Sequence, residues 1–99
     1  MHLVHHFGGG VYAKETHFAK NVAMAQHSHK HDHLSILATG RAMVCVDGAS
    51  EIHTGPACIT IAAGKAHTVV ALTDIVWYCI HATDETDPDQ VDETLIKEH

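Results

Sequence analysis

The sequence predicts an all-β protein, built as one small barrel or sandwich of short strands. Apolar residues occur in short runs at regular spacing, and turn-forming residues separate one run from the next. The length of 99 residues fits a single domain. A composition of 45% hydrophobic and 18% charged residues is ordinary for a soluble globular domain and too apolar for a disordered one.

Recognisable turns separate the expected strands. Asp47-Gly48 suits a tight hairpin turn, because both central positions of that turn need a positive φ angle. Thr54-Gly55-Pro56 marks a second turn. The expected strands are 11–18, 22–29, 34–38, 41–46, 49–53, 57–61, 67–72 and 75–82. These strands form a barrel over residues 11–82, and the Gly- and His-rich residues 1–10 are expected to be flexible.

The C-terminal residues carry a different pattern. Asp87 can cap a helix in which Pro88 takes the first position. Val91, Leu95 and Ile96 would then share one face of that helix. One short helix is therefore expected at residues 87–97, packed on the barrel or on a partner chain.

The charge balance restricts the partners of the protein. The formal net charge is -6 with histidine neutral, which argues against nucleic acid and against anionic membrane surfaces. No apolar stretch approaches the roughly 20 residues that cross a bilayer, and the N-terminus lacks the features of a signal peptide. We expect a cytoplasmic protein that pairs as a homodimer, because a small barrel gains from burying an edge strand.

Histidine is unusually frequent, with 12 residues in the chain, and four of them alternate at His27, His29, His31 and His33. In a strand, His27 and His29 point to the same side with Cα atoms roughly 6.7 Å apart. They can converge on one ion, since a metal–nitrogen bond is about 2.0–2.1 Å. All four on a straight strand would span roughly 20 Å, so the chain must bend. Either His31 or His33 then returns to the metal.

This segment resembles the first sequence motif of the cupin family. The pattern is His27-x-His29-x3-His33-x6-Gly40, in which the family usually has glutamate at the third position. A second motif follows after a hairpin. Its glycine and histidine are matched by Gly64 and His67.

The second motif departs from the family pattern at two places. The usual proline is Ala62 and the usual asparagine is Ala71, and the spacer after Gly55 is one residue longer than the common form. Neither replaced residue is a metal ligand in the family. The resemblance covers roughly residues 11–82.

The chain is thus similar to the small four-histidine cupins. The resemblance implies a double-stranded β-helix, or jelly-roll, barrel that holds one divalent transition-metal ion: Mn, Fe, Ni, Cu or Zn. The implied ligands are His27, His29, His33 and His67. The run Trp77–Asp84 also resembles small uncharacterised cupin-like proteins of phage genomes.

Two further residues are candidates for catalysis, Tyr78 and His81. They have opposite parity in the last expected strand, so only one of them faces the interior. If Trp77, Cys79 and His81 face inward, the pocket is apolar with His81 at its rim. If Tyr78 faces inward, it can act as a general acid or base.

Two functions fit this pattern. The first is a metal-dependent enzyme, of the dioxygenase or isomerase/lyase type, that acts on a small oxygenated molecule bound through the ion. The second is a non-catalytic module that binds a metal or a small ligand and acts through a partner protein. An open coordination position beside a pocket favours the enzyme, and a closed four-histidine site favours the binder.

Overall fold

The structure, a computed structural model, describes residues 2–26 and 32–83. Within these ranges the chain forms nine β-strands and no helix. The strands are β1 (His2–Gly8), β2 (Val11–Phe18), β3 (Ala23–Gln26), β4 (His33–Thr39), β5 (Arg41–Val46), β6 (Ala49–Thr54), β7 (Ala57–Ile61), β8 (His67–Ala71) and β9 (Ile75–Ala82). The expectation of an all-β protein is confirmed for the part of the chain that is described.

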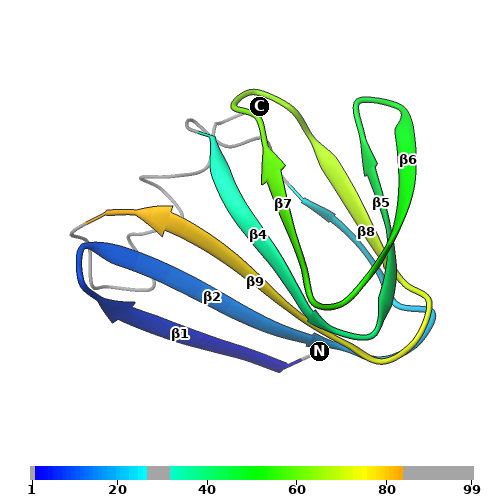
Figure 1. Cartoon of the computed structure of the whole chain (residues 1–99), viewed down its shortest axis with the longest axis horizontal. Coiled ribbons are helices and arrows are strands. Elements are labelled where there is room, and N and C mark those ends of the chain that lie inside the picture. The colour runs from blue at the N-terminus through cyan, green and yellow to red at the C-terminus, as the bar shows by residue number, and fades with distance from the viewer. Residues whose placement is uncertain (1, 27–31, 84–99) are drawn as a thin grey trace.

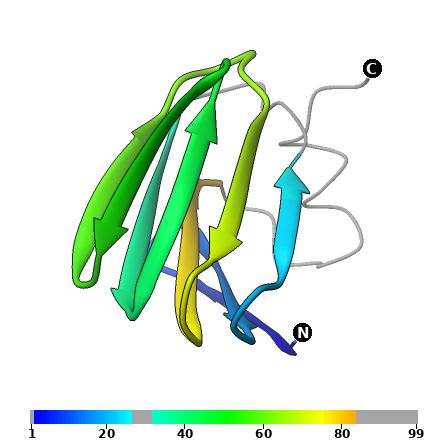
Figure 2. The same ribbon diagram turned by 90° about the vertical axis from the view of Figure 1, so that its right-hand side faces the viewer.

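The strands form two antiparallel sheets that face each other (Figures 1 and 2). One sheet has the order β1-β2-β9-β4-β7, and the other has the order β3-β8-β5-β6. The last strand, β9, lies in the middle of the five-stranded sheet, between β2 and β4. Strands that are distant in sequence are therefore neighbours in space, as the jelly-roll arrangement requires.

The N-terminal residues correct one expectation. Residues 1–10 were expected to be flexible, but His2–Gly8 pairs with β2 along its whole length. Gly9 and Gly10 have φ angles of 61° and 77°, so the glycine run is a tight hairpin turn rather than a linker. Phe7 stacks on Tyr12 with ring centroids 5.0 Å apart, which anchors the hairpin.

The hairpin between β5 and β6 is as expected. Asp47 and Gly48 occupy its turn with φ angles of 52° and 83°. The expected helix at residues 87–97 lies outside the described residues. Among residues 2–26 and 32–83, no helix is long and apolar enough to cross a bilayer.

The interior between the sheets changes character from one end to the other. Its apolar part contains Phe18, Leu37, Val69, Ile75 and Trp77, the last with no exposed surface. The inward side chains of β9 lead from this core toward the second end, in the order Ile75, Trp77, Cys79 and His81. The second end is where the buried histidines lie.

Candidate functional site

Three buried histidines meet at one end of the interior. His33 begins β4, His67 begins β8, and His81 lies near the end of β9. Their exposed fractions are 4%, 2% and 6%. The ring centroids of His33 and His67 are 5.7 Å apart, and those of His33 and His81 are 4.7 Å apart. The cluster draws on both sheets, because β4 and β9 belong to one sheet and β8 to the other.

Strand pairing explains how these residues come together. Leu34 is the register partner of Ile80, so their neighbours His33 and His81 lie side by side on the inward face. His67 is the register partner of Gln26 on β3 and of Val46 on β5. The histidine is thus fixed between two strands at the start of β8.

Two of the four predicted ligands can be located, and these two are brought together. They are His33 and His67, which are 34 residues apart in sequence and belong to different sheets. His27 and His29, together with the alternative third ligand His31, lie outside the described residues. Within residues 2–26 and 32–83, no three or more His, Cys, Asp or Glu side chains are arranged to hold a metal ion.

Asp32 links the two segments that carry the motif histidines. Its Oδ1 accepts a hydrogen bond of 2.7 Å from the backbone N–H of Ala63. This bond ties the loop before His67 to the residue that precedes His33. Asp32 is not among the site residues predicted from the sequence, although a short acidic side chain in a loop is a common acceptor for backbone N–H groups.

Tyr12 is a second residue of this region that is absent from the predictions made from the sequence. It is buried on β2, directly opposite His81 in the register, and their rings stack at 6.2 Å. Its hydroxyl lies 2.7 Å from Nδ1 of His5 on β1, in hydrogen-bond contact. Tyr12 has the same parity in β2 as the buried Thr16 and Phe18, and residues of one parity share a face of a strand. This shared parity was the signal in the sequence that Tyr12 faces the interior.

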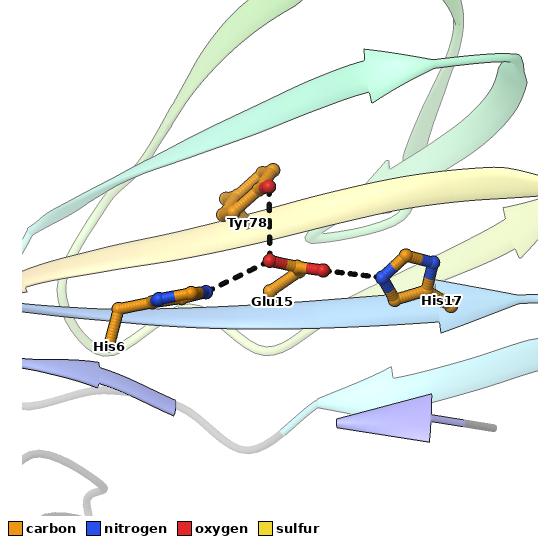
Figure 3. A network of polar contacts seen from close by, with 4 residues as sticks. All are labelled: His6, Glu15, His17 and Tyr78. Atoms are coloured by element: carbon orange, nitrogen blue, oxygen red, sulfur yellow. Dashed lines mark hydrogen bonds and ion pairs between the residues drawn. The ribbon is translucent and has the colours of Figure 1, made fainter. Parts of the chain in front are cut away.

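Alternate side chains of β9 face the interior of the fold. Trp77, Cys79 and His81 face inward, and Tyr78 lies on the opposite face of the sheet. The Tyr78 hydroxyl donates a 3.1 Å hydrogen bond to Oε1 of Glu15 (Figure 3). Of the two catalytic candidates, only His81 therefore lines the interior.

Glu15 is the centre of a polar network on this outer face (Figure 3). Besides Tyr78, its carboxylate accepts hydrogen bonds from Nε2 of His17 at 2.5 Å and from Nε2 of His6 at 2.9 Å. These bonds favour the ionised carboxylate, and they lower the pKa of Glu15 to about 2, with the bond from His17 as the largest cause and that from His6 next. The bond to Glu15 also raises the pKa of Tyr78, because it favours the protonated phenol.

We expect Glu15 to make folding stability depend on pH in the acid range. Its pKa is lower in the folded protein than the ordinary value of 4.5, so the unfolded chain binds more protons. The stabilisation is complete above pH 4.5 and is lost as the pH falls toward about 2. Urea unfolding at several pH values should show Glu15→Gln less stable than the wild type at neutral pH, with a gap that narrows on acidification.

The matched control for this experiment is Glu51→Gln. Glu51 also contacts a histidine, His53, at 3.3 Å, but its side chain is 77% exposed, so the pair contributes little. The stability of this variant should equal that of the wild type. A constant gap between wild type and Glu15→Gln from neutral pH to pH 2 would contradict the role given to Glu15.

Comparison with known proteins identifies the fold. No family model and no curated protein sequence matches the chain. Among solved structures, a cupin 2 domain-containing protein from Halorhodospira halophila aligns with a TM-score of 0.74 and 19% identity, over 92% of this chain and 73% of that one. A cupin superfamily protein from Desulfitobacterium hafniense aligns with a TM-score of 0.69 and 15% identity, over 84% and 79% of the two chains.

An enzyme has a similar region. Salicylate 1,2-dioxygenase from Pseudoaminobacter salicylatoxidans aligns with a TM-score of 0.75 and 7% identity, over 93% of this chain and 26% of the enzyme. At these identities the likeness concerns the fold, and a fold hosts many functions. The chain therefore has the cupin fold, with two facing antiparallel sheets.

Proposed function

We propose that this cupin-fold protein binds one divalent transition-metal ion in its interior, through His27, His29, His33 and His67. With this ion, the protein would act as a metal-dependent enzyme of the dioxygenase or isomerase/lyase type on a small oxygenated molecule. The observation that carries the proposal is the meeting of His33 and His67, which are buried and come from opposite sheets.

The separation of these two rings fits a shared ion. A metal–nitrogen bond of about 2.0–2.1 Å places the ion about 3.2 Å from the centre of each imidazole ring. Two such rings with an angle of about 90–130° at the ion have centres about 4.5–5.8 Å apart. The observed 5.7 Å between His33 and His67 lies within this range.

The sequence next to the described residues supports the other two ligands. His27 follows Gln26, which is the register partner of His67, and the pair His27-x-His29 resembles the first cupin motif. A donor set of neutral imidazoles suits zinc, copper, iron and nickel, and the resemblance to four-histidine cupins adds manganese.

The surrounding residues would prepare the site for a ligand. A divalent ion on four neutral imidazoles keeps its full charge and supplies a Lewis acid that polarises a bound oxygen atom. His81 stacks on His33 and restricts its ring orientation. The buried Ser35 and Trp77 close the interior below the histidines, so bulk water is excluded from that side.

Elemental analysis of the purified, untagged protein tests this proposal. We expect at least one equivalent of Mn, Fe, Ni, Cu or Zn per chain, either as purified or after reconstitution and desalting. An ion that binds in the interior should also change the NMR signals of His33 and His67. Failure to retain any of the five ions would overturn the proposal.

One observation favours the non-catalytic alternative. The buried polar residues in the described ranges are Thr16, His33, Ser35, His67 and His81. This set contains no carboxylate and no lysine, so within the described buried residues the candidates for a general acid or base are His81 and the hydroxyl of Tyr12. A metal-loaded protein whose spectrum does not respond to small bidentate oxygen ligands would favour the binding module.

A further inference from the structure

A second pair of histidines lies outside the barrel interior. His2 on β1 and His17 on β2 are direct register partners in the antiparallel pair. Their ring centroids are 5.4 Å apart, with an angle of 53° between the ring planes. His17 has the opposite parity to the buried Thr16 and Phe18, so the pair lies on the outer face of the five-stranded sheet.

The Glu15 carboxylate fixes which nitrogen of His17 carries a proton. The Glu15 carboxylate is in hydrogen-bond contact with Nε2 of His17, and an ionised carboxylate can only accept hydrogen bonds. Nε2 of His17 must therefore be the donor, and in the neutral ring Nδ1 carries the lone pair. Figure 3 shows the ring of His17 beside this carboxylate, with a dashed line for the contact between them. A histidine that donates one N–H to a carboxylate is the usual arrangement of a metal-binding histidine, because the bond orients the ring and raises its basicity.

Space for further ligands lies beside the pair. His2 and His17 line an open cleft of about 470 Å³, together with Thr39, Asp74 and the apolar Phe18 and Ile75. Oδ1 of Asp74 accepts a 2.8 Å hydrogen bond from the backbone N–H of Lys20, which fixes this carboxylate at the edge of the cleft. Water or a small anion can enter the cleft and fill coordination positions that the two histidines leave open.

We propose that His2 and His17 bind one divalent transition-metal ion of the zinc, copper or nickel class on the outer face of the sheet. With metal–nitrogen bonds of about 2.0–2.1 Å, ring centres 5.4 Å apart correspond to an angle of about 115° at the ion, close to tetrahedral. The chain supplies two ligands, in agreement with the lack of any three-residue metal-binding group in residues 2–26 and 32–83. Solvent or a small anion from the cleft supplies the others.

This site is independent of the interior site, and it has a structural consequence. β1 is the edge strand of the five-stranded sheet, and among the described strands it pairs only with β2. An ion on His2 and His17 cross-links β1 to β2 at the end opposite the Gly9-Gly10 turn. The bound ion would therefore stabilise the N-terminal hairpin in the folded state.

Calorimetric titration of the untagged full-length chain with Zn²⁺ tests the proposal. His2→Ala and His17→Ala should each lose one equivalent of bound zinc relative to the wild type. His2 is exposed at the start of its strand, so this variant keeps the test valid if His17→Ala folds poorly. Glu15→Gln keeps a hydrogen-bond acceptor but loses the charge, and should weaken this equivalent by about 10- to 100-fold.

His53→Ala is the matched control. His53 also lies beside a carboxylate, Glu51, but its register partner is Ala42 rather than a second histidine. Its titration should equal that of the wild type. Zinc binding by His2→Ala and His17→Ala that is indistinguishable from the wild type would overturn the proposal.

A spectroscopic readout separates this site from the interior one. Substoichiometric Cu²⁺ should broaden the NMR signals around His2 and His17, and this broadening should disappear in His17→Ala but persist in His67→Ala. A failure of the interior site would leave this result unchanged. Broadening confined to the surroundings of His33, His67 and His81 would overturn the outer site.

Discussion

Replacing His67 with alanine is expected to abolish metal binding in the barrel interior. His67 is the one predicted ligand that the four-stranded sheet contributes among the described residues, and its ring lies 5.7 Å from that of His33. Loss of a residue that only orients a ligand costs about 10- to 100-fold in metal affinity, so loss of a ligand itself should exceed about 100-fold. Metal analysis after desalting and competition with a chelator measure the effect.

Three controls make this result specific. His33→Ala should reproduce the loss, whereas His31→Ala and His53→Ala should bind the interior ion as the wild type does. Thermal unfolding of the metal-free proteins shows whether His67→Ala still folds, because truncation of a buried ring also leaves a cavity. A folded His67→Ala protein with wild-type affinity at the interior site would remove His67 from the ligand set.

The second large effect is expected for Gly40→Ala, which should destabilise the fold by about 2–4 kcal/mol. Gly40 lies between β4 and β5 with a φ angle of 87°, which L-residues rarely adopt. A Cβ atom there would overlap the backbone oxygen of Asp74 and lie 2.6 Å from Oγ1 of Thr73 and 2.8 Å from Cγ2 of Ile75. Backbone strain and overpacking therefore add. Chemical denaturation of the two proteins measures the difference.

Gly48→Ala separates these two contributions. Gly48 has a similar φ angle of 83°, but a Cβ atom there would meet nothing within 4 Å. We expect a loss of about 1–2 kcal/mol from the backbone alone. Equal losses of unfolding free energy for the two variants would show that the close approach of Thr73, Asp74 and Ile75 to Gly40 does not contribute to the destabilisation.

Gly40 also shows why a motif can be recognised before its physical basis is known. In the sequence, Gly40 is the last residue of a pattern that begins at His27. In the fold, the chain turns at Gly40 from one sheet to the other, and the loop before β9 packs against it. The spacing from His33 to Gly40 is the length of β4, which carries His33 at one end and the turn at the other.

The sequence by itself determined the strands and most of the turns. Alternation of apolar and polar residues and the Asp47-Gly48 turn are local signals, because strand geometry and φ preferences act over a few residues. The same alternation placed Trp77 and Tyr78 on opposite faces of one strand. It also failed locally at residues 1–10, where Gly9-Gly10 can be a linker or a turn, and only the pairing of β1 with β2 distinguishes these.

Only the tertiary structure decided which face of each strand is buried and which distant residues meet. His81 lies beside His33 because β9 is inserted between β2 and β4, a choice made by the packing of the whole chain. The partners of His2 and of Tyr12 follow from register in the same way. Sequence spacing measures separation along one strand, whereas a site is assembled across strands, and the register that aligns them is set by burial of the common core.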